Sequence, residues 1–209
     1  MIVVDVETTG TDPDVHAIVS IGAVDVADPT RQFYRECRIW DGARVQDEAL
    51  AVNGFTHEQV VDASKPSAEE TTAQFIAWCK ESDDRTLGGH NTAFDRDFLQ
   101  ASADRHNLAW HFGNRVLDLH SVAYAMLTRY GQEVPRKNSR SGLSLDAILP
   151  LIGLPQEPKP HNGLVGAQFE AGAFSRFLYG TNLLAEFARY PVPPWLSGTP
   201  IISDQRALF

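Results

Sequence analysis

Two acidic side chains stand close together at the end of an apolar run near the start of the chain. The segment IVVDVETTG, residues 2–10, has the pattern of a short buried strand that carries Asp5 and Glu7. Side chains two residues apart point to the same face of a strand, so we expect the two carboxylates to lie side by side. Two like charges that close oppose each other's ionisation unless a positive charge lies between them. The pair predicts a site for a hard divalent cation, with solvated acids at a strand end as the alternative.

A third acid and a histidine follow in two later segments. GHNTAFD ends at Asp95, in the expected first turn of a helix, where an acid can also serve only to stabilise the helix start. We expect His90 and Asn91 of the same segment to fix a loop by hydrogen bonds. His161 stands just before the last long helical pattern, residues 163–179, in the segment HNGLVGAQFEAGAF.

The elements that must position these residues follow from periodicity and capping signals. We expect strands at residues 2–7, 17–26, 32–39 and 85–88, and helices at residues 67–82, after 92, at 117–130, from Ser144 and at 163–179. We expect residues 131–142, with Arg136, Lys137 and Arg140, to form a mobile surface loop, and Pro150 to end or bend its helix. Strands followed by strand–helix alternation predict one α/β domain with a mixed sheet over residues 1–190, and an extended tail over residues 191–209.

Composition limits the classes of partner. Among 209 residues, 27 are acidic and 18 basic, which gives a net charge of −9. This charge argues against a protein that holds nucleic acid by a broad basic surface, but not against one that holds a strand end through metal ions. Cys37 and Cys79 lack metal-ligand spacing, and we see neither a basic, apolar leader nor a run of membrane-spanning length. We therefore expect a reducing, cytoplasmic setting without membrane association.

Taken in order, DVETTG, GHNTAFD and a histidine that opens a helix near the C-terminus resemble the three motifs of the DEDDh exonucleases. This family includes the proofreading subunits of bacterial DNA polymerases and ribonuclease T. The connecting segments IVSIGAVDV, ALAVNGFTHEQV and LSLDAI are similar to the family as well, and the resemblance covers roughly residues 2–178. It implies a ribonuclease H-like fold, with a mixed β-sheet flanked by helices.

The resemblance also implies a two-metal mechanism and a role for each acid. Two Mg²⁺ or Mn²⁺ ions would clamp the scissile phosphate. Asp5 would bridge both ions, Glu7 would hold the first, and Asp95 would support the second through water. His161 would take a proton from the attacking water, since a histidine titrates near neutral pH. The implied activity is 3′–5′ exonuclease cleavage of single-stranded DNA or RNA, with DNA favoured, to nucleoside 5′-monophosphates.

Four further residues fall where the family contacts the terminal nucleotide. Thr8 and Gly10 would shape the turn after the first strand and let the nucleotide approach the backbone. Glu48 and Asn53 fall at positions that contact the hydroxyl of the terminal sugar. The family often has histidine at the second of these positions, so Asn53 is a mild departure.

The largest departure from the family pattern is Gly166. The family places a metal-binding Asp five residues after the motif histidine, and here that position is Gly166. Glu170 lies one helical turn, about 6 Å, further along, so we do not expect it to substitute. A close helix–sheet contact is an alternative reason for the glycine.

The lost Asp leaves three accounts open: an introduced substitution, a natural relative that only binds strand ends, or metals held well enough by Asp5, Glu7 and substrate phosphates. We expect a weak or inactive exonuclease whose digestion of single-stranded DNA rises by orders of magnitude in Gly166→Asp. The rival from another class is a non-catalytic module that binds strand ends or recruits a partner.

The chain ends in QRALF, residues 205–209, which resembles the short peptide that binds bacterial sliding clamps. Leu208 and Phe209 would fill an apolar pocket of the clamp, and Gln205 would fix the orientation. An apolar end that folds back onto the domain is the alternative.

Overall fold

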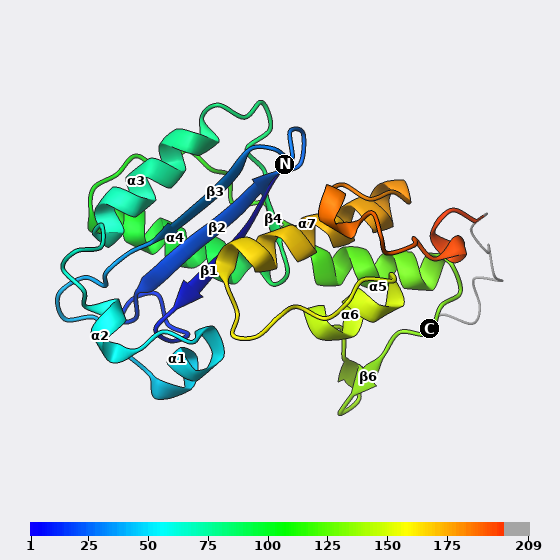
Figure 1. Cartoon of the computed structure of the whole chain (residues 1–209), viewed down its shortest axis with the longest axis horizontal. Helices are drawn as coiled ribbons and strands as arrows, with labels where there is room; N and C mark the ends of the chain where they lie inside the picture. Colours follow the sequence, from blue (N-terminus) through cyan, green and yellow to red (C-terminus); the bar gives the residue numbers. More distant parts are fainter. Residues whose placement is uncertain (199–209) are drawn as a thin grey trace.

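The computed structural model describes residues 1–198, and Figure 1 shows its ribbon. The proposed clamp-binding residues Gln205, Leu208 and Phe209 lie outside the described residues.

A five-stranded mixed sheet forms the centre of the domain, with the strand order β3-β2-β1-β4-β5. The strands are β1 (Ile2–Thr8), β2 (Ile18–Asp25), β3 (Gln32–Glu36), β4 (Leu87–Gly89) and β5 (Leu117–Asp118). The first three form an antiparallel meander, whereas β4 pairs in parallel with β1 and β5 in parallel with β4. The predicted mixed α/β sheet is confirmed.

Seven helices of the described residues surround this sheet: α1 (Asp47–Asn53), α2 (His57–Val60), α3 (Ala68–Cys79), α4 (Thr92–Arg105), α5 (Leu119–Arg129), α6 (Leu145–Leu151) and α7 (Gly163–Tyr179). Ser67 caps α3 through a capping box, and Ser144 caps α6. Pro150 does not end α6 but lies one residue before its end.

Three short features differ from the sequence-based expectation. The helices α1 and α2 occupy a segment for which we predicted neither a helix nor a strand. Residues 131–142, expected as a loop, contain the small hairpin β6 (Arg136–Lys137) and β7 (Arg140–Ser141). All three features are too short to show a helical or strand period, so periodicity could not reveal them.

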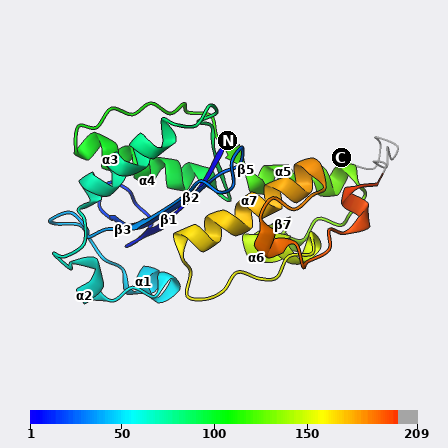
Figure 2. The ribbon, with the colours of Figure 1, turned by 45° about the horizontal axis from the view of Figure 1, so that its top comes forward.

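The two faces of the sheet carry different helices, as Figure 2 shows from a second direction. Ile2, Val4 and Val6 of β1 pack into a core with residues of α3 and α4. Val3 of the same strand packs on the opposite face, with residues of α5, α6 and α7. Alternation along β1 places Asp5 and Glu7 on the α7 face.

Helix α7 approaches the sheet closely at its N-terminus. A Cβ atom on Gly163 would lie 2.8 Å from the carbonyl oxygen of Asp5 and 3.1 Å from the backbone nitrogen of Gly22. Only glycine at this position allows so near an approach. The first turn of α7 is thereby brought against the strand that carries the paired acids.

The segment after α7 packs back onto the domain through a buried arginine. The Arg176 guanidinium donates to the carbonyl oxygens of Ile152 (2.5 Å) and Tyr190 (2.6 Å), and to Oδ1 of Asn182 (2.6 Å). Two short 3₁₀ helices follow, Ala185–Phe187 and Pro194–Leu196, so residues 194–196 are not extended as we expected. Within residues 1–198, none of the helices has the length and apolar character needed to cross a membrane.

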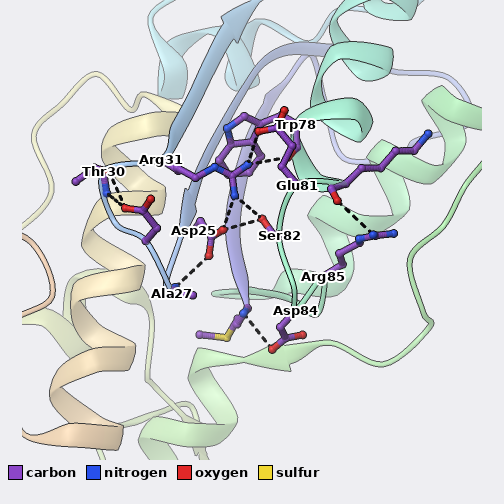
Figure 3. A network of polar contacts seen from close by, with 12 residues as sticks. Asp25, Ala27, Thr30, Arg31, Trp78, Glu81, Ser82, Asp84 and Arg85 are labelled. Carbon is purple, nitrogen blue, oxygen red and sulfur yellow. Dashed lines mark hydrogen bonds and ion pairs between the residues drawn. The ribbon is translucent and has the colours of Figure 1, made fainter.

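An ion pair between the buried Asp25 and the partly exposed Arg31 lies at the end of β2 (Figure 3). Asp25 pairs with Ile2 at the start of β1, whereas Asp5 and Glu7 lie further along that strand. Asp25 is 3% exposed and accepts from Arg31 Nη1 at 2.8 Å, Ser82 Oγ at 2.7 Å and the Ala27 backbone at 3.0 Å. Arg31 also donates to Glu81 at 3.1 Å. We call Asp25, Arg31 and Ser82 the Asp25 network.

Candidate active site

The first two acids occupy the C-terminal half of β1. Asp5 pairs with Gly22 of β2 and Glu7 pairs with Ser20, just before a register shift between Glu7 and Thr8. Glu7 is 8% exposed, and Asp5 is partly exposed. Two carboxylates on one face of a central strand are costly, because burial disfavours the charged form of each.

The third acid reaches β1 from α4. Asp95 lies in the first turn of this helix and is 4% exposed. Its Oδ1 accepts a hydrogen bond of 2.9 Å from the backbone nitrogen of Val6, the residue between Asp5 and Glu7. The structure therefore brings together three acids that come from points 90 residues apart in the chain.

The loop before α4 is fixed by hydrogen bonds and by backbone conformation. The His90 Nε2 atom lies 2.8 Å from the carbonyl oxygen of Leu143. Asn91 adopts φ 63°, a left-handed conformation that asparagine tolerates better than most residues. The hydrogen bond expected of His90 is present, whereas Asn91 acts through its backbone conformation and makes no side-chain cap to α4.

The electrostatics show that the acids face one another. Burial raises the pKa of Asp5 well above its ordinary range, and Asp95, Glu7 and Glu157 raise it further. Burial, and then Glu157, raises the pKa of Glu7 to about 7. Burial raises the pKa of Asp95 to about 8, although its hydrogen bond from Val6 acts in the opposite direction. Charge of opposite sign among these groups would lower all three pKa values.

His161 lies beside this cluster, immediately before α7. Its backbone nitrogen donates to the carbonyl oxygen of Val52 at 3.1 Å, and Asn162 caps the helix that follows. The Nδ1 atom lies 3.2 Å from Oε2 of Glu157, and the side chain is 29% exposed. It borders a hollow of about 180 Å³ that is also lined by Asn53.

Gly166 lies one turn into α7, directly against Asp5. A Cβ atom at this position would collide with Oδ2 of Asp5 and would lie 3.5 Å from Oε1 of Glu157. The obstacle is the end of a side chain, not sheet backbone as at Gly163. The close helix–sheet contact is thus real at Gly163, whereas a side chain at 166 requires Asp5 to rotate.

Sequence reasoning missed Glu157, which lies in the loop between α6 and α7. This residue is 5% exposed, and its Oε1 atom has no hydrogen-bond partner among the described residues. The loop has no periodicity, so its path could not be inferred. The available signal was an acid four residues before the motif histidine.

Glu170 also lies closer to the site than its place one turn beyond Gly166 led us to expect. It is 4% exposed, and Oε2 has no partner among residues 1–198. Burial raises its pKa well above the ordinary range, and Asp5 and then Asp95 raise it further, whereas a hydrogen bond from the His90 backbone lowers it. We refer to Asp5, Glu7, Asp95, Glu157 and Glu170 together as the acidic site.

Three of the four expected substrate-binding residues meet at the turn after β1. Thr8 Oγ1 donates to the carbonyl oxygen of Gly10 at 2.6 Å, and Asn53 Nδ2 donates to the carbonyl oxygen of Thr8 at 3.0 Å. Gly10 lies against the His16 ring, which leaves no room for a Cβ atom. Glu48 lies apart from this turn, exposed in the first turn of α1.

The donor set of the acidic site suits a hard cation, because every donor is a carboxylate oxygen and two of these oxygens have no hydrogen-bond partner in the part of the chain that the structure describes. Across residues 1–198, no three His, Cys, Asp or Glu side chains form a ready-made metal-binding group in their present rotamers.

The sequence comparisons agree with this geometry. The profile of the exonuclease family RNase_T matches residues 2–174. DNA polymerase III PolC-type from Thermotoga petrophila is 27% identical over 178 residues, which are 85% of this chain and 12% of that protein. Ribonuclease T from Yersinia pseudotuberculosis is 31% identical over 121 residues, which cover 51% of this chain and 55% of that protein. The chain thus spans about an eighth of the first relative's length and about half of the second's.

The solved structures show the same fold. Escherichia coli exonuclease I, in complex with a dT13 oligonucleotide labelled 5cy, superposes with a TM-score of 0.67 and 15% identity, over 86% of this chain and 41% of that chain. The nuclease domain of 3'hExo, a DEDDh family member bound to rAMP, has a TM-score of 0.65 and 21% identity, over 88% of this chain and 93% of that chain. The ribonuclease H-like fold and the resemblance to DEDDh exonucleases are confirmed, and this chain belongs to the RNase_T family of exonucleases.

Proposed function

We propose that this chain is a metal-dependent 3′–5′ exonuclease that releases nucleoside 5′-monophosphates from single-stranded ends. The observation that carries the proposal is the convergence of Asp5, Glu7 and Asp95 at one end of β1, next to His161. The three acids come from two separate motifs; Asp95 and Glu7 raise the pKa of Asp5, and Glu7 raises that of Asp95. An arrangement so costly to folding has a physical reason if a cation occupies it in the working protein.

DEDDh exonucleases depend on divalent metal ions, and the carboxylates here fit Mg²⁺ or Mn²⁺. In the proposed assignment Asp5 and Glu7 would hold the first ion, and Asp5 together with Asp95 would hold the second. When bound, such ions stabilise the negative charge that develops on a scissile phosphate. The hydrogen bond from Val6 fixes one oxygen of Asp95 and leaves the other to face the site.

His161 is the proposed general base. Its Nδ1 atom faces Glu157, which leaves Nε2 to take a proton from the attacking water. The negative charge of Glu157 also stabilises the imidazolium that forms when the proton arrives. A partly exposed side chain at the rim of a hollow can then pass this proton to solvent.

The hollow beside His161 is the proposed place for the terminal nucleotide. Asn53 lines this hollow and donates to the carbonyl oxygen of Thr8, whose hydroxyl donates to that of Gly10. We therefore assign Asn53, Thr8 and Gly10, together with Glu48 of α1, to the sugar and to the turn that receives it. The exposed Arg136, Lys137 and Arg140 of the β6–β7 hairpin can track a phosphate backbone. We favour DNA over RNA because a DNA polymerase is among the relatives, although ribonuclease T is another.

Gly166 adds a finer proposal, namely that the activity is impaired. Loss of even an indirect metal contact costs about 10–100-fold in affinity or activity, and a direct ligand costs at least as much. A second candidate function follows from the same glycine: a non-catalytic module that holds strand ends. Recruitment by a sliding clamp through Gln205, Leu208 and Phe209 remains a separate proposal, supported by the sequence of the tail alone.

Digestion of end-labelled single-stranded DNA and RNA, with Mn²⁺ or with EDTA, tests the proposal. We expect metal-dependent shortening from the 3′ end, with mononucleotide products, and a faster rate in Gly166→Asp, provided that Asp5 rotates to admit the new side chain. The Asp5→Asn variant is the inactive control. Binding of 3′ ends without cleavage, in both the unmodified chain and Gly166→Asp, would instead support the non-catalytic module.

A further inference from the structure

Position 166 lacks a carboxylate, yet a carboxylate oxygen lies beside it. The ideal Cβ position of residue 166 is 3.5 Å from Oε1 of Glu157. Glu157 reaches this place from the loop before α7, nine residues earlier in the chain. An Asp on α7 and the Glu of this loop would therefore direct their oxygens into the same small region.

The two oxygens of Glu157 have different surroundings. Oε2 lies 3.2 Å from Nδ1 of His161, whereas Oε1 is buried without a hydrogen-bond partner among the described residues. The whole residue is 5% exposed. A buried oxygen without a partner is rare because its desolvation is not compensated. The expected partner is therefore a bound water molecule or ion.

The neighbours of Glu157 are those that a ligand of the first metal requires. Its charge acts on Asp5 and on Glu7, the two residues assigned to that ion. Asp5 and then Asp95 raise the pKa of Glu170, but none of its atoms is among the three nearest to the ideal Cβ position of residue 166, whereas Oε1 of Glu157 is. Glu157 is therefore better placed than Glu170 to replace residue 166.

We propose that Glu157 supplies the fourth metal-binding carboxylate that Gly166 lacks, with Oε1 facing the ion and Oε2 orienting His161. This inference rests on the proposed function, since it concerns the same metal site. A carboxylate held by a loop is less rigid than one on a helix, so the site binds its ion more weakly than a site with Asp at 166. We expect Gly166→Asp to bind Mn²⁺ more tightly than the unmodified chain, and Glu157→Gln to bind it more weakly.

Calorimetric titration of Mn²⁺ measures this order without relying on cleavage. Glu157→Gln keeps an oxygen that can accept from His161 but loses the charge, so it separates metal binding from histidine positioning. We expect its Mn²⁺ dissociation constant to rise about 10–100-fold. The same rise is expected in a His161→Ala background, because the loss does not act through the histidine. Glu186→Gln, at an exposed acid outside the site, is the matched control and should bind as the unmodified chain does.

A carboxylate exchange adds a second measurement. If Glu157→Gln folds poorly, which thermal unfolding without metal will show, the double variant Glu157→Gln/Gly166→Asp still tests the idea. We expect it to bind Mn²⁺ at least as tightly as the unmodified chain and to digest single-stranded DNA.

Three results would overturn the assignment. Unchanged Mn²⁺ affinity in Glu157→Gln, with affinity lost in Asp5→Asn, would remove Glu157 as a ligand and leave the exonuclease proposal intact. A loss confined to Glu170→Gln would transfer the role to Glu170. Absence of Mn²⁺ binding and of digestion in both the unmodified chain and Gly166→Asp would refute the proposed function together with this inference.

Discussion

The Asp25 network and the acidic site lie toward opposite ends of the β1–β2 pair, and the carboxyl groups in them have opposite surroundings. In the Asp25 network, a guanidinium, a hydroxyl and a backbone N–H surround the carboxylate of Asp25 (Figure 3). In the acidic site, carboxylates face carboxylates, and one oxygen each of Glu157 and Glu170 has no partner within residues 1–198.

The difference separates a structural acid from a functional one. An acid that serves folding receives its hydrogen bonds and opposite charge from the chain, because an unpaired buried charge is costly. Within residues 1–198 the acidic site leaves that requirement open, so its folding cost is relieved when the acids take up protons or when a cation binds. Strained, unsatisfied polar groups of this kind are typical of sites that bind a ligand.

The largest effect should separate the two groups by activity. We expect Asp5→Asn to lower Mn²⁺-dependent digestion of single-stranded DNA at least about 100-fold, since it removes the acid assigned to both ions. Asp25→Asn should retain the rate of the unmodified chain at a temperature where both are folded. Rates from a time course of labelled oligonucleotide give the comparison, and equal loss in both variants would erase the distinction between the groups.

The pH dependence of stability should reveal that Glu7 and Asp95 lack an opposite charge in the metal-free protein. The folded protein holds protons on Glu7 up to about pH 7 and on Asp95 up to about pH 8, whereas the unfolded chain releases them near the ordinary values of 4.5 and 3.8. Between these limits the folded state binds more protons, so the free energy of unfolding falls as pH rises from about 4 to about 8.

Urea denaturation in EDTA at a series of pH values measures this slope. Addition of Mn²⁺ at pH 8 should restore stability by mass action, because the ion binds the folded state. A free energy of unfolding that rises with pH over this range in EDTA would contradict the pKa directions on which the comparison rests.

Removal of the Asp25 carboxylate should lower stability rather than activity. We expect Asp25→Asn to lower the free energy of unfolding by about 2–3 kcal/mol, because Arg31 loses its buried counter-charge. The value lies below that of a fully buried pair because the Arg31 side chain is 23% exposed and keeps its contact with Glu81. Urea denaturation at pH 7 provides the measurement, with the exposed Glu186→Gln as the control.

The smallest effect concerns a single partner of Asp25. Ser82→Ala removes the 2.7 Å hydrogen bond to its carboxylate and leaves Arg31 in place. We expect a loss of about 1 kcal/mol in the free energy of unfolding and no change in Mn²⁺ affinity. The same pair of measurements, calorimetry and denaturation, decides the case; a change in Mn²⁺ affinity would show that the two groups are coupled.

The sequence allowed most of the sheet and the long helices to be predicted. The β-branched run of β1 and the capping serines Ser67 and Ser144 are local signals, and local structure follows them. Asp5, Glu7, Asp95 and His161 were found from residue type and motif order. Glu157 was not, because its position depends on the path of an irregular loop, which only tertiary contacts such as that of His161 with Val52 define.

Arg176 connects the segment after α7 to the loop that bears Glu157. Its guanidinium joins the carbonyl of Ile152, where the loop bearing Glu157 begins, to that of Tyr190 beyond the last long helix. A chain cut after residue 180 would keep every acid named above, yet it would strip this cation of two of its anchors, Asn182 and Tyr190. Shortened versions of the protein should therefore keep the segment that Arg176 contacts, or the loop that bears Glu157 will lose part of its support.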